Sequence, residues 1–419
     1  MKIRILAKSQ FNSGKDGFGT SCGYHTMVSG DARSLAGLSA GVCYMPATLD
    51  ALVMEESDKR FKRAEKTLLN KHHSVFGHGQ VTLAIEDAPK ILAMILNNEK
   101  IYNTSEKSGR YTEMWTVGLE KDYYERWTKV FEQRIAEVYP EMSEKMRHKY
   151  ALENARYIIS ISTPATTMIY TCSIQQLNYI YGWMKKWWDD ASYRFQGVLD
   201  PLAMRIGKVF DEFTQQIEDL GLVVEGLEDP KDRTFSLFAE RKRTEEFGEN
   251  YCINYTGSFT QLAQAQRHRT LSYEFYIDAP FEIYVPRIIR GTEFEEKWRD
   301  DAWDLFIETG DYPQGMLVNI CERGTFDNFI LKCKERLCSR TMLEIADQTE
   351  ATLIKYYYSV IAKYGNPCSA EYNPAMVTFI GKPLEKRIGV ARCMCPFNFE
   401  CTEESACPFG PKHFVDRLI

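Results

Sequence analysis

The sequence predicts an α+β protein made of two domains. The chain has 419 residues, and 44% of them are hydrophobic, which is enough for sizeable cores. Candidate strands and amphipathic helices alternate, and their order repeats after a stretch rich in glycine, proline and alternating charges at 221–232. This stretch is the best candidate for a linker. It separates copy one (residues 1–220) from copy two (residues 233–365), and a cysteine-bearing tail follows at 366–419.

Copy one opens with an edge strand, because residues 1–10 alternate apolar and polar side chains. A helix rich in Lys, Glu, Leu and Ala follows at 50–70. It is followed by a short strand at 80–85 and a helix at 89–97. This helix has a proline in its first turn, where the missing N–H would have had no partner within the helix. Longer amphipathic helices are predicted at 122–138, 145–159 and 174–189.

Copy two repeats this order more compactly. Residues 235–240 and 252–255 have extended patterns, residues 259–267 have a helical pattern, and residues 326–364 are strongly helical. The succession of extended and helical segments therefore matches that of copy one.

A weak internal repeat supports the two-domain reading. Polar clusters at 98–100 and 267–269 end similar helical segments, at an offset of 169 residues. Residues 177–180 resemble residues 326–329 at the smaller offset of 149. The shrinking offset predicts that copy two lost a loop between these points, and a repeat of this length indicates a duplicated domain rather than a solenoid.

Bulk composition excludes several classes of protein. The formal charge of −6 argues against a surface that coats a nucleic-acid polymer, since such surfaces are basic. We find no apolar stretch long enough to span a bilayer and no signal-peptide pattern at the start. Several of the twelve cysteines lie in periodic apolar segments, which favours reduced thiols. We expect a cytoplasmic globular protein without a membrane partner.

One polar cluster suits an anion. Arg267-His268-Arg269 follows a predicted helix, and two arginines that flank a histidine can offer forked donors to a phosphate or to an electron-rich ring system. The plain alternative is a solvated charged turn, which is the commoner meaning of such a triplet when it stands alone.

A second cluster suits a nucleotide. It runs from Glu106 to Tyr111, where Gly109 lets the backbone approach a ligand closely, and Ser108 and Arg110 add a hydroxyl and a cation beside exposed amides. An ordinary polar loop is an equally good reading of the segment alone.

Together these clusters resemble the signature of the flavin-dependent thymidylate synthase (ThyX) family. There Arg-His-Arg, a serine and a Glu-x-Ser-Gly-Arg-Tyr loop form one short run. Copy two keeps Arg-His-Arg with Ser272, and copy one keeps the loop at 106–111, so each copy retains the half that the other has lost. The resemblance implies two tandem α/β domains, each a mostly antiparallel sheet with long helices, that form a pseudo-dimer.

Further resemblances follow in the family's order. Residues 72–78 resemble its His-x-Ser-x-x-Glu-His element, with Gly77 in place of the glutamate. Residues 153–156 resemble the helix whose arginine grips the nucleotide. Residues 336–345 resemble the late Arg-x-Cys-x-Arg-Ala-Gln-x-Glu-Ile helix, with Thr341 and Met342 in place of Ala-Gln.

The resemblance implies reductive methylation of dUMP to dTMP, with methylenetetrahydrofolate and reduced FAD, and with NADPH as the reductant of the flavin. In this family one subunit contributes the Ser-Gly-Arg loop and the nucleotide arginine, and a neighbour contributes a glutamine and the late-helix arginine. The implied residues are catalytic Ser108, Arg110 and Arg336; substrate-binding Glu106, Gly109, Arg156 and Gln264; and flavin-binding His72, Ser74, Arg267, His268 and Arg269.

The family is tetrameric, so we expect a homodimer of the fused chain that mimics the tetramer. Because the sequence departs from the family pattern, two alternatives stay open. One is a pyrimidine-nucleotide hydroxymethylase on the same scaffold, and the other is a non-catalytic nucleotide-binding or assembly protein.

The tail offers a weak metal candidate. Four of its thiols are candidate ligands for a structural Zn²⁺: Cys393, Cys395, Cys401 and Cys407. Their spacing is not a common zinc signature and no histidine intervenes, so reduced surface thiols are the preferred reading and no metal is expected.

Overall fold

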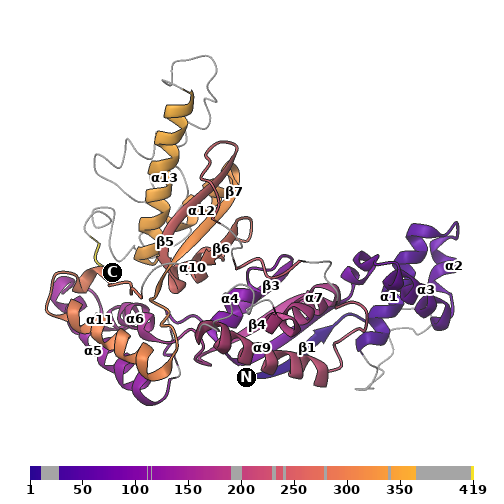
Figure 1. The fold of residues 1–419 in the computed structure, drawn as a ribbon, viewed down its shortest axis with the longest axis horizontal. Helices are drawn as coiled ribbons and strands as arrows, with labels where there is room; N and C mark the ends of the chain where they lie inside the picture. Colours follow the sequence, from indigo (N-terminus) through magenta and orange to yellow (C-terminus); the bar gives the residue numbers. More distant parts are fainter. Residues whose placement is uncertain are drawn as a thin grey trace. The chain divides into compact units, whose positions relative to one another are not determined.

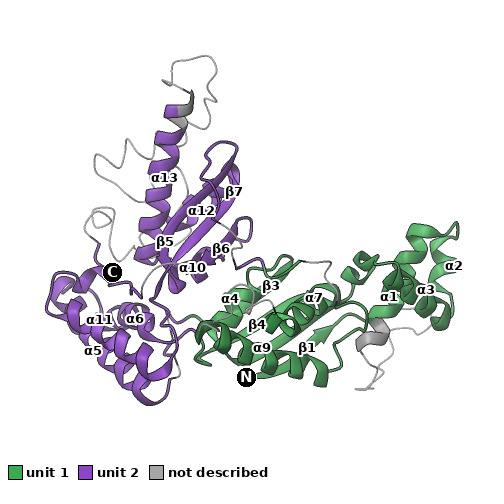
Figure 2. Cartoon of the chain, viewed as in Figure 1, with its two compact units in different colours: residues 1–108, 162–235 green, residues 109–161, 236–419 purple. Residues whose placement is uncertain are grey.

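The chain forms two compact units of mixed helix and antiparallel sheet. The computed structural model describes residues 1–10, 28–110, 112–114, 116–189, 201–228, 233–238, 242–277, 281–337, 341–364 and 417–419. Unit 1 comprises Met1–Ser108 and Ser162–Phe235, and unit 2 comprises Gly109–Ile161 and Ser236–Ile419 (Figure 2). Residues 109–161 thus lie in unit 2, although the sequence repeat assigns them to copy one.

Unit 1 is built on a four-stranded antiparallel sheet in the order β1-β2-β4-β3 (Figure 1). Its strands are β1 (Lys2–Lys8), β2 (Gln80–Ala88), β3 (Tyr102–Glu106) and β4 (Thr166–Ser173). Strand β4 alternates between buried and more exposed residues, as a strand with one covered face does. The helices of the sheet region are α4 (Lys90–Leu96), α7 (Ile174–Lys185) and α9 (Pro201–Asp219).

Aromatic residues make much of the core beside this sheet. Trp183 on α7 packs edge-on against Phe235, and Phe210 on α9 packs against both Phe235 and Trp187. Gly182 lets the backbone pass close by, since a Cβ there would lie 2.0 Å from the carbonyl oxygen of Glu228.

The remaining helices of unit 1 pack through small residues. They are α1 (Val28–Tyr44), α2 (Leu49–Val53), α3 (Ser57–Leu69) and the 3-10 turn η1 (His73–His78). Ala36 and Ala40 on α1 are fully buried, and a Cβ at Gly37 would lie 2.1 Å from the carbonyl oxygen of Arg60 on α3. The close approach of α1 and α3 explains the alanine- and glycine-rich sequence of α1.

Unit 2 contains a helical part and a three-stranded antiparallel sheet. The helical part comprises α5 (Gly118–Val138), α6 (Glu144–Ala155), η2 (Arg156–Ile158), η3 (Arg287–Ile289) and α11 (Phe294–Thr309). The rings of Trp127 on α5 and Trp298 on α11 pack edge-on, with their centroids 4.9 Å apart. The indole N–H of Trp127 donates to Asp301 Oδ2 at 2.8 Å. This aromatic contact fixes α11 against α5.

The sheet of unit 2 has the order β5-β7-β6. Its elements are β5 (Asn250–Ser258), α10 (Phe259–Ala265), β6 (Ser272–Tyr276), β7 (Leu317–Thr325), α12 (Phe326–Arg336) and α13 (Leu343–Tyr364). Tyr356 of α13 packs against Tyr251 and Phe329, so one face of this sheet is covered by α12 and α13 (Figure 1).

The order of elements repeats between the two sheets. The series β2-α4-β3 followed by β4-α7 recurs as β5-α10-β6 followed by β7-α12, and the strand orders β2-β4-β3 and β5-β7-β6 correspond. Ser173 and Thr325 cap α7 and α12 in the same way, each accepting from the N–H three residues later. These caps are 152 residues apart, three more than the offset predicted from sequence, and copy one carries α5 and α6 where copy two carries α11.

Two predicted helices are interrupted. The helix expected at 50–70 divides into α2 and α3, and the helix expected at 326–364 divides into α12 and α13. No helix within the described ranges is long and apolar enough to cross a membrane.

Candidate functional site

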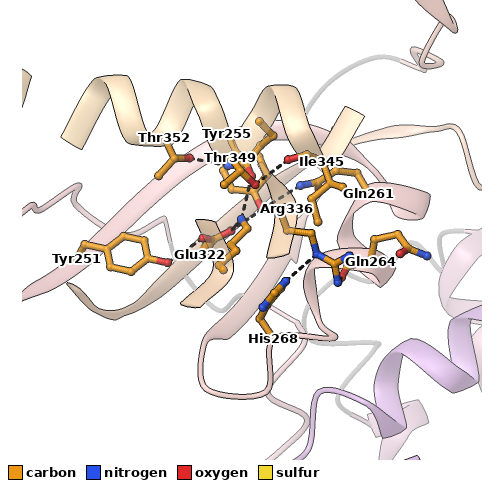
Figure 3. Close-up of polar contacts among 12 residues, drawn as sticks. Tyr251, Tyr255, Gln261, Gln264, His268, Glu322, Arg336, Ile345, Thr349 and Thr352 are labelled. Carbon is orange, nitrogen blue, oxygen red and sulfur yellow. Dashed lines mark hydrogen bonds and ion pairs between the residues drawn. The ribbon is translucent and has the colours of Figure 1, made fainter. Parts of the chain in front are cut away.

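Arg336 is the best-positioned arginine of copy two. It ends α12, and its Nε donates to His268 Nε2 at 2.7 Å, while its Nη2 donates to the carbonyl oxygen of Gln264 at 3.2 Å (Figure 3). Two bonds to one guanidinium fix its direction. His268 is buried, whereas its neighbours Arg267 and Arg269 are exposed. The Arg-His-Arg triplet therefore anchors Arg336 by its middle residue and presents its outer two to ligand or solvent.

The ring of His268 is neutral. Burial lowers the pKa of His268 to about 2, and the cations of Arg336 and Lys332 add to this effect. A neutral ring whose Nε2 accepts from Arg336 carries its proton on Nδ1. Glu335 Oε2 lies 3.8 Å from Nε2, but with an uncharged ring this contact is not an ion pair.

A buried polar network lies next to this site. Lys332 Nζ and Glu322 Oε2 form a 2.6 Å ion pair in which both side chains are fully buried. The hydroxyls of Tyr251 and Tyr255 donate to the two oxygens of Glu322 at 2.8 and 3.0 Å (Figure 3). Lys332 also donates to Gln348 Oε1 at 2.9 Å. Full burial with every oxygen bonded stabilises the network and fixes α12.

Copy one contributes a second group of charged residues to unit 2. Arg110 Nε is ion-paired with Glu153 Oε2, and Arg156 follows Glu153 by one turn. A Cβ at Gly109 would lie 3.5 Å from Arg156 Cδ, so the backbone of the loop approaches this arginine closely. Gly109, Arg110 and Arg156 thus lie near one another in unit 2.

Arg156 is a buried cation with few partners. Arg156 is only 5% exposed. Its Nη2 lies 2.7 Å from Met342 Sδ, and its Nε has no hydrogen-bond partner among the described residues. Burial lowers the pKa of Arg156, and Arg110 adds to the lowering, while Glu153 and Glu344 oppose it. A thioether is a weak acceptor, so this guanidinium is prepared for an anion.

Glu344 joins copy one to copy two. Its carboxylate accepts from the N–H and the hydroxyl of Ser258 at 2.8 and 2.7 Å, and from the hydroxyl of Tyr157 at 2.8 Å. Burial raises the pKa of Glu344, and these hydrogen bonds act against the rise. Because Ser258 caps α10 and Tyr157 follows Arg156, Glu344 links the helix that carries Gln264 to the turn that carries Arg156.

The charge of Arg110 in copy one acts on Arg336 in copy two. Burial lowers the pKa of Arg336, and the charges of Arg110 and Arg267 add to this lowering. The charge of Glu335 opposes this lowering, so the charged neighbours of Arg336 are one carboxylate, one arginine from the nucleotide loop and one arginine from the Arg-His-Arg triplet, all within unit 2. We call Arg110, Arg156 and Arg336 the arginine cluster.

The other predicted residues lie in unit 1 or outside the described residues. Glu106 is ion-paired with Lys90 at 2.6 Å, and Ser108 is half-buried at the end of the same segment. His72 is exposed, and its Nδ1 lies 3.0 Å from the hydroxyl oxygen of Tyr44; Ser74 is also exposed. The tail cysteines and Tyr111 lie outside the described residues. Among the residues that the structure describes, no group of His, Cys, Asp and Glu could hold a metal ion.

Comparison with known proteins finds a family that is similar to part of the chain. Residues 26–184 match the model of a family described as thymidylate synthase complementing protein, the flavin-dependent thymidylate synthases. This part of the chain is similar to that family. The match runs from residue 26 of copy one into α7 and includes the loop of Arg110 and the turn of Arg156. The family resemblance read from the sequence is thereby confirmed, while the tandem arrangement stays a prediction.

One solved structure that is similar to the chain is the crystal structure of a UMP/dUMP methylase PolB from Streptomyces cacaoi bound with 5-Br dUMP. It shares 11% identity, covers 53% of this chain and 96% of its own, and has a TM-score of 0.31. No curated protein matches the chain.

Sequence reasoning did not single out several residues of this region as site residues. Glu344 lies inside the late-helix motif at 336–345, and that motif was the sequence signal that could have identified it. Lys332 and Glu322 gave no signal, because a buried ion pair whose members lie on a strand and the following helix has no distinctive spacing.

Proposed function

We propose that the protein is a flavin-dependent thymidylate synthase-type enzyme that methylates dUMP to dTMP, with methylenetetrahydrofolate as carbon donor and NADPH as reductant of FAD. The family match over residues 26–184 supports the reaction class. The observation that carries the proposal is the position of Arg336, which has both Arg110 and Arg267 as charged neighbours. The motifs that the resemblance assigns to nucleotide and to flavin each contribute an arginine whose charge lowers the pKa of Arg336, and this supports the proposal.

The arginine cluster suits the phosphate of dUMP. A phosphate monoester carries nearly two negative charges at neutral pH, and guanidinium groups bind it with paired hydrogen bonds. Arg156 is buried with a thioether as its hydrogen-bond acceptor, and Arg110 is held beside it by Glu153. We assign the phosphate to these two residues, with Gly109 as the point of close backbone approach and Ser108 and Glu106 at the nucleoside.

The residues of the Arg-His-Arg triplet fit a flavin cofactor. Arg267 and Arg269 are exposed on either side of buried His268, and guanidinium groups suit a diphosphate or the oxygens of a flavin ring. Reduced FAD supplies the hydride in this chemistry. Arg267, His268 and Arg269 would hold it.

Arg336 is the proposed electrostatic catalyst. The bonds from its guanidinium to His268 and to the backbone of Gln264 hold it in place before substrate arrives. A pre-oriented cation in a buried site stabilises negative charge that develops on a uracil ring without the cost of reorganisation. The role of His268 is to orient this arginine, since the neutral ring is an acceptor and not a proton donor at Nε2.

We infer that the chain is a tandem of two diverged copies. The repeated order of elements and the matching caps of α7 and α12 support the inference. Each copy would keep the half-site that the fused partner requires, and two chains would associate as a homodimer that mimics the family's tetramer. Light scattering tests this assembly, and a stable monomer that still binds nucleotide and flavin would contradict it.

The experiment for the reaction begins with the absorbance spectrum of the purified protein. We expect flavin bands that shift when dUMP is added, and dTMP formation when the folate and NADPH are supplied. Arg336→Gln and Arg110→Gln should abolish turnover, whereas Arg299→Gln, an exposed arginine paired only with Glu295, should leave it unchanged. Full turnover in both of the first two variants would show that the assignment is wrong.

A hydroxymethyl transfer is the second candidate, because Met342 replaces the family's glutamine at the position that contacts Arg156. Mass spectrometry of the nucleotide product distinguishes a methyl from a hydroxymethyl group. A protein that binds dUMP and flavin but forms neither product would be a non-catalytic relative.

A further inference from the structure

Two cysteine thiols lie together on the sheet of unit 2. Cys252 is on β5 and Cys321 is on β7, and their Sγ atoms are 3.5 Å apart. The two strands are antiparallel neighbours, in which Cys252 lies opposite Arg323 and Cys321 lies opposite Asn254. The cysteines are therefore diagonal neighbours on one face of the sheet, because residues two apart on a strand share a face. The fold thus brings together two thiols that are 69 positions apart in the chain.

The thiols are on the face of the sheet away from α12 and α13. Tyr251 and Glu322, which adjoin the two cysteines in sequence, bond to each other on the opposite face, where Glu322 also meets Lys332 of α12. Cys321 is buried, whereas Cys252 is partly exposed. A small oxidant in solution therefore meets Cys252 first.

The protonation of Cys321 also makes Cys252 the first thiol to react. Burial raises the pKa of the Cys321 thiol to about 12, and its hydrogen bond with Cys252 adds to the rise. The nearest carboxylate in the register is Glu274, opposite Cys321 on β6, and it is held by two hydrogen-bonded cations, Arg243 and Arg323. Because the thiolate is the nucleophile in sulfur chemistry, a thiol that stays protonated at neutral pH waits for its partner to be activated.

We propose that Cys252 and Cys321 are a redox-active thiol pair that forms a disulfide when the protein meets hydrogen peroxide. The thiolate of Cys252 attacks one peroxide oxygen and becomes a sulfenic acid, and the other oxygen leaves as water after it takes up the proton of the Cys252 thiol. The sulfur of Cys321 then attacks Cys252 Sγ, and the displaced hydroxyl group takes up the proton of Cys321 and leaves as a second water. The two thiols lose two electrons, and the peroxide gains them.

The distance between the thiols favours the second step. The sulfur atoms have to approach by about 1.5 Å to reach the bond length of a disulfide. Hydrogen bonds between β5 and β7 continue on both sides of the pair, so the strands hold the two side chains beside each other while Cys252 is oxidised. A sulfenic acid that has a thiol within contact distance condenses with it before a further oxidation step occurs.

The thiol pair is particular to copy two and independent of the proposed function. The corresponding strands of copy one, β2 and β4, hold one cysteine, Cys172, which is buried. Burial raises the pKa of the Cys172 thiol to about 12, so this residue serves as an internal control that should stay reduced. The reaction proposed for dUMP and flavin uses none of these three thiols. Loss of that reaction would leave the thiol chemistry unchanged, and the reverse also holds.

The test maps the oxidised thiols of the full chain. Reduced wild-type protein is treated with a small excess of hydrogen peroxide, its remaining thiols are blocked with N-ethylmaleimide in denaturant, and it is digested with trypsin. Cleavage after lysine and arginine gives peptides 244–267 and 300–323, in which Cys252 and Cys321 are the sole cysteines. We expect both peptides to lose the maleimide label and to appear as one cross-linked species that dithiothreitol separates. Peptide 157–185, which carries Cys172, should keep its label.

Two variants test the order of the steps. Cys321→Ser keeps the accessible thiol and removes its partner, so Cys252 should accumulate as a sulfenic acid that dimedone traps. Cys252→Ser should leave Cys321 unlabelled by dimedone under the same conditions. Labelling of Cys321 in this variant would contradict the order of attack. If Cys321→Ser does not fold, the peptide map of the wild type decides the proposal by itself.

The proposal is overturned if Cys252 is oxidised to a sulfinic or sulfonic acid without the cross-link. It is overturned equally if the cross-link forms no more readily in the folded chain than in guanidinium chloride, since the fold would then contribute nothing. Exposed Cys43 reports that the dose of peroxide is sufficient. Both peptides keeping their label at a dose that oxidises Cys43 would also refute the pair.

Discussion

Replacing His268 with glutamine tests the electrostatics of the site most directly. The pKa of His268 is lowered to about 2, from an ordinary value of 6.5, because the ring is buried beside Arg336 and Lys332. Below pH 6.5 the unfolded chain binds a proton at this position that the folded protein does not, so stability falls as pH falls toward 2. Between pH 7 and pH 4.5 this linkage removes about 2.5 kcal/mol of unfolding free energy, at roughly 1.4 kcal/mol per pH unit.

Glutamine offers an oxygen near the position of Nε2, so it can still accept from Arg336 Nε, and it does not titrate. We therefore expect His268→Gln to be less stable than the wild type at pH 7 by a modest amount and to lose less stability on acidification. Denaturant titrations at several pH values between 4.5 and 7 measure both curves. The raised pKa of Glu344 acts in the opposite direction, but it is common to both proteins and cancels in the difference. Parallel curves would refute the neutral, buried histidine.

Two further substitutions test the packing of each unit. Gly182→Ala should lower the unfolding free energy by about 2 kcal/mol, because its Cβ would lie 2.0 Å from the carbonyl oxygen of Glu228, and a thermal melt followed by circular dichroism will show the change. Lys332→Met should cost about 3–5 kcal/mol, since it leaves Glu322 buried without its cation. Adding Glu322→Gln should restore more than half of that loss, and a double variant as unstable as the single one would contradict the ion-pair argument.

The long helices and the first strands could be predicted because burial imposes a period on the sequence. Helix α5 (Gly118–Val138) and strand β2 (Gln80–Ala88) were predicted with only their ends misplaced. Strand β3 (Tyr102–Glu106) was not, because its sequence Tyr-Asn-Thr-Ser-Glu is that of a polar loop, and its partner β4 supplies the pairing. Tertiary pairing, not local propensity, makes this segment a strand.

The candidate site could be predicted in its parts but not in its connections. The polar motifs pointed to Arg110 and to Arg267-His268-Arg269, because forked cations beside glycine or histidine suit phosphate and flavin, whereas Arg156 and Arg336 came from the family resemblance alone. No local pattern shows that Glu344 ties the turn of Arg156 to the cap of α10, because that contact joins residues 187 positions apart.

The position that follows α4 in copy one shows how the same place in a repeat can lose a binding role and keep a structural one. Where copy two has His268, copy one has Glu99, which is fully buried and ion-paired at 2.9 Å with Arg233. Arg233 also lies over the ring of Trp183, 5.2 Å from its centroid. A carboxylate here repels phosphate, so we infer that this end of copy one stabilises its fold and does not bind a cofactor.

Arg233→Ala should therefore lower the unfolding free energy of the protein by about 1–2 kcal/mol. This is less than the usual cost of breaking a buried ion pair, because the side chain of Arg233 is half exposed. Its flavin affinity should match the wild type. Arg267→Ala should do the opposite: the side chain is exposed, so the melting temperature should hold while flavin binding is lost. Thermal melts and flavin absorbance titrations of the two variants measure both effects. Loss of flavin binding in Arg233→Ala with a folded protein would mean that both copies hold cofactor, and the division of the site between them would have to be abandoned.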